Sequence, residues 1–279
     1  MVVLKITIIS KVYKSSIRYD IINSMFKIGK SMLKKLVGTI LISSSLIAGN
    51  INIAVAANVS YAIDDLKKEF NKIYPNTKVR ITIGGSGKLT AQIKNGAPYN
   101  LFMSANMKYP QSLYNDKVAI TKPIIYARGS LAILSSKKQD FSKGIELLKD
   151  KSITRIAIAN PKTAPYGKAS IEAIKNAKIY DKIKSKFVYG ESISQTVSYT
   201  VTATDIGMIA SSSLYSPQMG HFKKNINWVE VDSSLYTPIN QGIVILKNAK
   251  DNVEVKAFYD FILSDSAKKI FIDFGYLVK

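Results

Sequence analysis

The sequence predicts an α/β protein in which short buried strands alternate with amphipathic helices. Short apolar runs recur along the chain, segments with helical spacing follow them, and Gly, Pro or Asn lie at the junctions. Alternation of this kind favours parallel sheets that are flanked by helices. A chain of 279 residues, 47% of them hydrophobic, can bury one or two cores of this type.

The first strands and helices are expected between residues 50 and 103. Pro75 and the pair Gly96 and Pro98 end the two helices, because Pro cannot continue a helix and Gly favours its end. A Gly-rich turn over 84–87 precedes the second helix. The strands are expected at 50–57, 79–83 and 101–103, and the helices at 59–73 and from 89 to 93.

The remainder of the chain continues the alternation and indicates two lobes. A strand at 124–134 would leave the first lobe, and one at 242–246 would return to it. The chain would then cross near Arg128 and Thr237, with a cleft between the lobes. Further elements are expected at 145–148, 156–159, 169–177, 187–189 and 206–210, and terminal helices at 255–263 and 267–274.

The first 49 residues are expected to lie outside the mature protein. A cationic segment that ends at Lys34 and Lys35 precedes an apolar run, and small residues follow at Ala48 and Gly49. This pattern is typical of a secretory signal peptide, and the run is shorter than the roughly 20 residues of a membrane span. The predicted organisation is 1–49 as upstream segment and signal peptide, 50–127 plus 238–279 as lobe I, and 128–237 as lobe II.

Charge and composition exclude several functions. The net charge of +21 first suggests a nucleic-acid partner, but only four of the 40 basic residues are Arg, the residue that such surfaces favour. We therefore expect a solvated Lys-rich surface and no nucleic-acid partner. The absence of Cys and the single His221 argue against thiol chemistry, disulfides and His-based metal sites. We expect no metal bound directly by protein ligands.

Four turns between a strand and a helix share a property that suits anion binding. Each places small or Gly-rich residues where a helix begins, and helix starts carry unpaired N–H groups and partial positive charge. Such turns bind oxyanions without cationic side chains. The turns are Ala57-Asn58, Gly85-Ser86-Gly87, Ala164-Pro165-Tyr166-Gly167 and Glu191-Ser192-Ile193. Taken singly, Asn58 or Ser86 would more often be a simple helix cap.

One motif resembles a nucleotide-binding loop but does not match it. The segment Gly84-Gly-Ser-Gly-Lys88 has Thr82 where that loop needs its first Gly, and Leu89 where it needs Ser or Thr. We therefore do not expect an NTPase.

In combination, several segments resemble the periplasmic molybdate-binding proteins of bacterial ABC transporters. The resemblance covers nearly all of residues 50–279, and its Gly-Ala-Pro and Phe-Tyr-Asp segments are not demanded by composition or periodicity. The segments that carry it are Ile53-Ala-Val-Ala-Ala-Asn58, Gly85-Ser86 with Leu89 and Gln92-Ile93, Gly96-Ala-Pro-Tyr-Asn-Leu-Phe-Met-Ser-Ala105, Asn160-Pro161 with Pro165-Tyr-Gly167, Asp205-Ile-Gly-Met-Ile209, and Val255-Lys-Ala-Phe-Tyr-Asp260 through Phe274-Gly-Tyr276.

The resemblance implies a two-lobe Venus-flytrap binding protein, each lobe a mixed, mostly parallel sheet flanked by helices. It implies a molybdate or tungstate ion that is held by neutral hydrogen-bond donors, without catalysis and without a cofactor. It also implies a periplasmic monomer that delivers the ion to a membrane permease. The residues that match the ligand-binding positions are Ala57, Asn58, Ser86, Tyr166 and Ile193.

One position departs from part of that family. Some members use a Tyr hydroxyl at the end of the Gly-Ile-Val strand, where this chain has Ala210. The bulky Tyr166 could replace part of that contact. Two alternatives stay open at the level of sequence: a binder of another ligand such as sulfate, phosphate or ferric iron, and an enzyme, for which no credible nucleophile–base pair is found.

Overall fold

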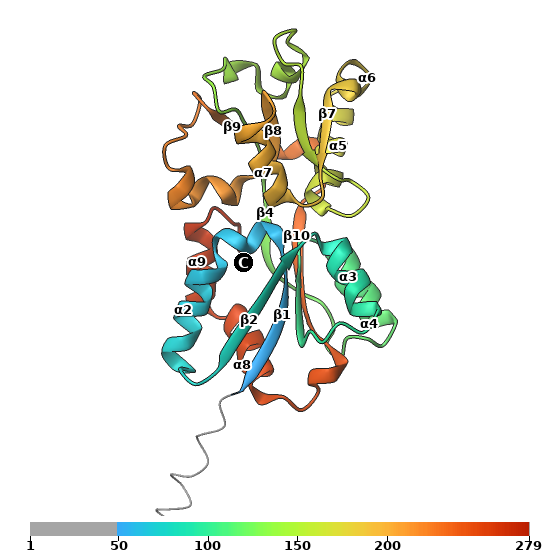
Figure 1. Ribbon diagram of the computed structural model, residues 1–279, viewed down its shortest axis with the longest axis vertical. Coiled ribbons are helices and arrows are strands. Elements are labelled where there is room, and N and C mark those ends of the chain that lie inside the picture. The colour runs from blue at the N-terminus through green and yellow to red at the C-terminus, as the bar shows by residue number, and fades with distance from the viewer. Residues whose placement is uncertain (1–48, 279) are drawn as a thin grey trace, which may run out of the picture. The chain divides into compact units, whose positions relative to one another are not determined.

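The computed structural model describes residues 49–278, which fold around two five-stranded mixed sheets (Figure 1). In each sheet three neighbouring strands are parallel, and two more strands follow at one side, each antiparallel to the strand before it. The first sheet has the order β2 (Lys78–Gly84), β1 (Asn50–Ala56), β3 (Leu101–Ser104), β10 (Ile239–Ile245) and β4 (Ile124–Gly129). The second has the order β7 (Phe187–Gly190), β6 (Ile156–Ala159), β8 (Ile206–Ala210), β5 (Leu131–Leu134) and β9 (Trp228–Glu230). The predicted α/β fold with two mixed sheets is confirmed.

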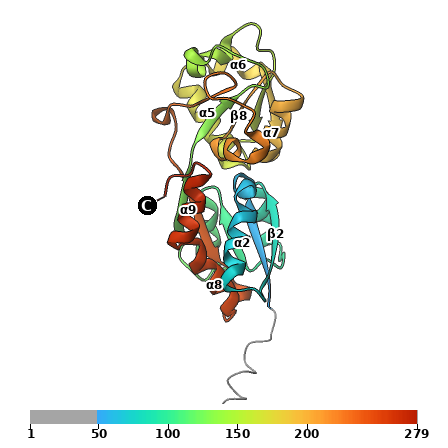
Figure 2. The same cartoon turned by 90° about the vertical axis from the view of Figure 1, so that its left-hand side faces the viewer.

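Helices cover both faces of each sheet (Figures 1 and 2). The first sheet is flanked by α2 (Ile63–Ile73), α8 (Val253–Ile262) and α9 (Asp265–Asp273) on one face, and by α3 (Ser86–Lys94) and α4 (Lys108–Asn115) on the other. The second is flanked by α5 (Pro165–Asn176), α6 (Tyr180–Ile183) and the 3-10 segment η2 (Phe141–Lys149) on one face, and by α7 (Ile193–Thr202) on the other. The remaining 3-10 segments are η1 (Ala57–Tyr61), η3 (Lys184–Lys186), η4 (Ser211–Tyr215), η5 (Pro217–Met219), η6 (Ser233–Leu235) and η7 (Lys247–Ala249).

The period-2 pattern of strand β1 shows how the sequence builds these layers. Ile53 and Val55 point to the face that holds α2, α8 and α9, where Phe70 and Phe258 pack against them. Ala54 points to the opposite face and meets the α3 and α4 side. Burial of both faces explains why this strand reads as a nearly continuous apolar run.

The chain crosses between the sheets twice. It leaves the first sheet after Gly129 and enters the second at Leu131, and it returns between β9 and β10. The single strand expected at 124–134 is therefore wrong, because it is divided at Ser130, directly after Gly129, into two strands of different sheets. We call the part around the first sheet lobe I and the part around the second lobe II. The exact lobe limits, 50–127 plus 238–279 and 128–237, stay a prediction.

Two further elements differ from expectation. Helix α3 begins at Ser86 rather than Leu89, so Ser86 is its first residue instead of part of a preceding turn. The helix α4 has no counterpart in the sequence prediction, since Pro110 within it resembles a break. Proline is tolerated there because it lies in the first turn, where an N–H would have no acceptor.

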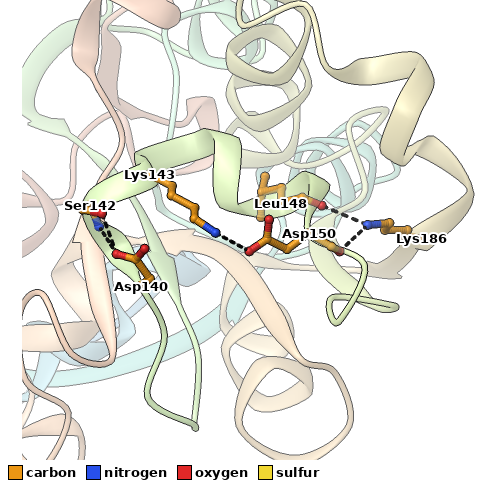
Figure 3. Close-up of polar contacts among 6 residues, drawn as sticks. All are labelled: Asp140, Ser142, Lys143, Leu148, Asp150 and Lys186. Atoms are coloured by element: carbon orange, nitrogen blue, oxygen red, sulfur yellow. Dashed lines mark hydrogen bonds and ion pairs between the residues drawn. The ribbon is translucent and has the colours of Figure 1, made fainter.

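Lysines on the surface of lobe II serve the local fold, as the segment around η2 illustrates. Lys186 Nζ donates to the carbonyl oxygens of Leu148 at 3.1 Å and Asp150 at 3.0 Å, and thereby satisfies the end of η2 (Figure 3). Lys143 pairs with the Asp150 carboxylate at 2.9 Å, and Asp140 caps the start of the segment. Lys143 and Lys186 therefore have structural partners within lobe II.

None of the helices described between residues 49 and 278 is long and apolar enough to cross a membrane. The predicted signal peptide lies outside the described residues.

Candidate oxyanion site

A small cavity lies where the carboxyl ends of the parallel strands of both sheets face each other. Its volume is about 10 Å³, close to the space that one water molecule needs. Its walls would therefore have to move outward to take in a tetrahedral oxyanion. All five predicted site residues line it, together with six neighbours. The complete lining is Ala56, Ala57, Asn58, Gly84, Gly85, Ser86, Ala105, Ala164, Pro165, Tyr166 and Ile193.

Four helix starts bring backbone N–H groups to this cavity. Ala57 begins η1 after β1, Ser86 begins α3 after β2, and Ile193 begins α7 after β7. Tyr166 follows Pro165, the first residue of α5 after β6. The first N–H groups of a helix have no acceptor within it, and the helix dipole adds partial positive charge. The arrangement is suited to a negatively charged ligand.

The Ser86 hydroxyl is held as a hydrogen-bond donor. Its oxygen accepts the backbone N–H of Ala105 at 3.0 Å, and the side chain does not cap helix α3. A hydroxyl carries one hydrogen, and this hydrogen is left over when the oxygen serves as the acceptor. Ser86 is buried and lines the cavity, so its O–H is available to a ligand oxygen.

The side-chain amide of Asn58 points into a buried polar network rather than serving as a helix cap. Its Nδ2 donates to Gln241 Oε1 at 2.8 Å and to the Tyr276 hydroxyl at 2.9 Å. Both amide hydrogens are thereby used, and Oδ1 is buried without a hydrogen-bond partner. Asn58 can therefore offer its backbone N–H to an anion, while its side-chain donors hold the turn in place.

A β-bulge arranges the rest of this network. The ladder between β4 and β10 pairs Gln241 with Ala127 and then Gly242 with Ile125, so Tyr126 is an extra residue in β4. The Tyr126 hydroxyl donates to Gln241 Oε1 at 2.8 Å. Gln241 Nε2 donates to the Tyr166 hydroxyl at 3.3 Å. The buried amide of Gln241 in lobe I thus connects the bulged Tyr126 with a tyrosine of lobe II.

Burial raises the pKa of the three network tyrosines, Tyr126, Tyr166 and Tyr276, above the ordinary value for tyrosine. Desolvation is the main cause in each, because it disfavours the phenolate. These hydroxyls therefore stay protonated and neutral around the cavity at physiological pH.

Direct contacts hold the two lobes together around the cavity. The Gly87 N–H of α3 donates to the Thr163 carbonyl of lobe II at 2.9 Å. The Ser212 hydroxyl of lobe II donates to the Asn58 carbonyl at 3.2 Å. Lys88 and Glu191 form an ion pair of 3.4 Å across the lobes, with both side chains more than 60% exposed. Solvent screening makes that exposed pair a weak contributor to stability.

The chemistry of the lining is neutral. None of the eleven lining residues carries a charged side chain. Within residues 49–278 there is also no group of three or more His, Asp or Glu that could hold a metal ion. An anion bound here would be recognised by dipoles and hydrogen bonds alone.

A second cavity is larger, but its lining is less suited to binding an anion. It measures about 310 Å³ and lies between the edge strand β4, α8, α9 and the chain end. Arg128 and Lys268 border it, while the Arg128 guanidinium already donates to Asn240 Oδ1 at 2.9 Å. Most of the other lining residues are apolar, and no helix start is among them. We therefore place the candidate site at the convergent helix starts.

A sequence model of bacterial extracellular solute-binding proteins matches residues 51–277, which is most of the chain. The chain belongs to this family. A molybdate-binding protein of Azotobacter vinelandii is 32% identical over 248 residues, which cover 88% of this chain and 97% of that protein. A molybdate-binding protein of Rhodobacter capsulatus is 32% identical over 235 residues, covering 83% and 90% respectively. These relatives confirm the resemblance that the sequence motifs indicate.

Solved structures agree with this family membership. The periplasmic molybdate-binding protein of Azotobacter vinelandii superposes on this solute-binding protein with a TM-score of 0.76 at 29% identity, covering 82% of this chain and 99% of that one. The substrate-binding domain of a putative molybdenum ABC transporter from Clostridium difficile gives 0.61 at 28% identity, with coverage of 82% and 99%. The sulfate-binding protein SubI of Mycobacterium tuberculosis gives 0.65 at 13% identity, covering 82% and 87%, and shows the shared fold alone.

The structure of this solute-binding protein brings Ala57, Asn58, Ser86, Tyr166 and Ile193 to one cavity, although their role in binding stays a prediction. Sequence reasoning missed Gln241, Tyr126 and Tyr276 behind that cavity. No sequence signal singles out Gln241, which follows the polar Asn240 in strand β10, and only the structure shows that its side chain is fully buried. Ala210 is fully buried at the end of β8. The Tyr166 side chain is also buried, and its hydroxyl accepts a hydrogen bond from Gln241.

Proposed function

We propose that this protein captures a molybdate or tungstate dianion between its two lobes and delivers it to an ABC transporter. The observation that supports this most is the convergence of four helix starts, from chain segments far apart in sequence, on one neutral cavity. Backbone N–H groups and the Ser86 hydroxyl would bind the ion's oxygens. The two relatives that are 32% identical are molybdate-binding proteins over nearly their full length, which supports the same ligand.

The donor character of the lining favours an anion that carries no proton. Molybdate and tungstate are fully ionised at neutral pH, so each oxygen only accepts hydrogen bonds. A protonated phosphate needs an acceptor in the site, and no carboxylate lines the cavity. Donors held at the starts of helices would also discriminate by size between these ions and the smaller sulfate, because each N–H group has a fixed direction.

Sulfate or phosphate is the alternative ligand, and one atom favours phosphate. Asn58 lines the cavity, and its Oδ1 is buried without a partner. An unpaired acceptor is costly when buried and would be satisfied by an anion that carries a hydrogen. Hydrogen phosphate meets that condition, whereas molybdate does not.

The wider role follows from the same proposal. A protein that captures an ion without changing it needs no catalytic group and no cofactor, so we propose a non-enzymatic role with the ion as ligand. We place the protein in the periplasm after removal of a signal peptide, as a monomer that docks on a membrane permease.

A thermal-shift comparison of oxyanions tests the proposed ligand. A ligand that binds only the folded protein at 100 times its Kd stabilises it by about 2.7 kcal/mol, which raises the melting temperature by several degrees. We expect this shift with molybdate and tungstate and a much smaller one with sulfate and phosphate at equal concentration. A large shift with phosphate alone would instead support the alternative that the Asn58 Oδ1 suggests.

A further inference from the structure

A chain of hydrogen bonds connects the end of the polypeptide to both lobes, and its direction follows from a single hydroxyl. The Tyr276 hydroxyl lies 2.8 Å from the Asn58 carbonyl oxygen and 2.9 Å from the Asn58 side-chain amide. A carbonyl oxygen can only accept, so Tyr276 must give its one hydrogen to it. The same hydroxyl must then accept from the amide, which requires Asn58 Nδ2 at that position and turns Oδ1 away.

The orientation of Asn58 determines the orientation of Gln241. The second hydrogen of Asn58 Nδ2 needs an acceptor, so Oε1 of Gln241 faces Asn58 at 2.8 Å. This oxygen also accepts the Tyr126 hydroxyl at 2.8 Å, which agrees with the assignment. Gln241 Nε2 must therefore point the other way, where it donates to Tyr166. We call Tyr276, Asn58, Gln241 and Tyr166 the relay.

The last contact of the relay crosses between the lobes at the point where the chain itself crosses. Gln241 lies on β10 in lobe I, and Tyr166 lies on α5 in lobe II. Gly129, the last residue of β4 before the crossing, packs against both. A Cβ atom at Gly129 would lie 1.9 Å from the Tyr166 hydroxyl and 2.8 Å from Gln241 Nε2. The other relay contacts stay within lobe I.

We propose that Gln241 is a positioning residue that couples closure of the lobes to the Asn58 turn through Tyr166. The bulge at Tyr126 supports this, because it lies opposite the fully buried Gln241. The Tyr126 hydroxyl donates to Oε1 of this amide, which leaves Nε2 to face Tyr166 of lobe II. When the lobes part, Nε2 loses Tyr166 and meets water, while Oε1 keeps Asn58 and Tyr126. The relay thus favours the closed arrangement in which the Tyr166 backbone N–H reaches the cavity. This inference rests on the proposed oxyanion-binding function.

The Tyr166→Phe variant tests the inter-lobe contact without disturbing the backbone N–H that lines the cavity. Its matched control is Tyr259→Phe, which removes a buried tyrosine hydroxyl that interacts with Thr121 inside lobe I. Calorimetry with molybdate should give a Kd about 2- to 10-fold higher for Tyr166→Phe, the equivalent of one neutral hydrogen bond. The melting temperature of its free form should stay within roughly a few degrees of the wild type, because the contact forms only in the closed population. Tyr259→Phe should leave the Kd unchanged.

A direct measure of closure separates this inference from the proposed function. The chain contains no Cys, so spin labels can be attached to single cysteines introduced at the exposed Lys68 and Lys182, one on each lobe. Tyr166→Phe should lower the closed population relative to the wild type and Tyr259→Phe. If the wild type binds none of the tested oxyanions, the proposed function fails, and the distances in the free protein still test the relay. An unchanged closed population in Tyr166→Phe, or no closed population in the wild type, would overturn the relay.

A double-mutant cycle tests whether Tyr166 acts through Gln241. Gln241→Met keeps the side-chain volume nearly constant and removes both hydrogen-bonding atoms. Once Gln241 is Met, the further change Tyr166→Phe should alter the Kd for molybdate by less than about twofold, because their shared contact is already lost. Full additivity of the two changes would contradict the coupling.

Discussion

At the scale of single residues, the site divides into groups that would face the ligand and groups that hold them. Ser86 could be selected from sequence because a hydroxyl in a Gly-rich turn before a helix suits an anion. Gln241 and Tyr276 could not, because their role depends on contacts 183 and 218 residues away along the chain. The structure also changes how Asn58 is expected to act, since its two side-chain hydrogens are used inside the protein.

Ser86→Asp should abolish molybdate binding and leave the free protein as stable as the wild type. Asp is favourable in the first turn of helix α3 because of the helix dipole, and its carboxylate can still accept the Ala105 N–H. Towards a dianion, however, it donates nothing and adds repulsion of about several kcal/mol at an effective dielectric of about 20. Calorimetry and thermal melting of the free form check the two halves of this prediction.

Ser86→Ala serves as the comparison for that variant. It leaves the Ala105 N–H without its acceptor, so the unfolding free energy should fall by about 1–3 kcal/mol while binding weakens but persists. Molybdate binding retained in Ser86→Asp would remove Ser86 from the site.

Asn58→Ala should lower both the stability of the free protein and its affinity for molybdate. A residue that acted only as a ligand donor would weaken binding without a loss of stability when replaced. The structure predicts a loss of about 1–3 kcal/mol in unfolding free energy, because two buried hydrogen bonds disappear and the turn is loosened. Urea unfolding and calorimetry measure the two effects. A variant with wild-type stability and reduced affinity would instead favour a role of Asn58 as a ligand donor alone.

At the scale of secondary-structure elements, regular periodicity was predictable and the junctions were not. Strand β1 could be predicted because nearly all of its residues are apolar, as in a strand that is buried on both faces. The division of 124–134 into β4 and β5 was missed because the residues on both sides of Gly129 and Ser130 suit a strand, and only the tertiary fold sends the two halves to different sheets. The start of α3 was placed three residues late, since Gly85 and Gly87 resemble a turn when their surroundings are unknown.

Gly87→Ala should weaken binding by opposing closure while leaving the free protein stable. Gly87 lies in the first turn of α3, where Ala is favoured by roughly 0.5–1 kcal/mol when the lobes are apart. In the closed arrangement a Cβ would lie 2.8 Å from the Thr163 oxygen and 2.7 Å from the Tyr109 hydroxyl. Overpacking of this kind costs about 1–3 kcal/mol, or roughly 5- to 150-fold in Kd. Small-angle scattering with saturating molybdate should show less compaction than for the wild type.

Gly220→Ala is the control for the added methyl group. Its Cβ would meet the Pro217 carbonyl oxygen at an ordinary 3.5 Å, within lobe II. This variant should bind and compact as the wild type does. Equal affinity of Gly87→Ala and Gly220→Ala would argue against closure at the α3 turn.

At the scale of the whole molecule, the fold class and family could be predicted from sequence, and the meeting of the lobes could not. Strand–helix alternation and the family motifs are local signals that survive without coordinates. The contacts across the lobes, such as Gly87 with Thr163 and Gln241 with Tyr166, join residues that are remote in sequence and carry no periodic signal. The sequence likewise does not predict which lysines hold the fold together. Lys186, for example, donates to two carbonyl oxygens at the end of η2.

Stability of the whole protein should be independent of tyrosine ionisation up to about pH 10 and fall above it. Burial raises the pKa of Tyr61 to about 12 and raises those of Tyr126, Tyr166 and Tyr276 as well. Unfolded tyrosines ionise near pH 10, so above that pH the unfolded chain releases protons that the folded protein keeps. The stabilisation is complete below about pH 10 and is lost as the pH rises towards the folded values. Urea unfolding between about pH 8 and pH 12, with phenolate absorbance as the probe, should show this; a steep loss already below about pH 9 would contradict it.

The central claim is that a neutral cavity between two lobes selects a tetrahedral dianion. Titration calorimetry of the wild-type protein with molybdate, tungstate, sulfate and phosphate under identical conditions tests it most directly. Four helix starts and the Ser86 hydroxyl lead us to expect 1:1 binding of molybdate and tungstate, with sulfate and phosphate weaker by at least about tenfold, or 1.4 kcal/mol. Equal affinity for sulfate, or binding of phosphate in preference to molybdate, would contradict the account.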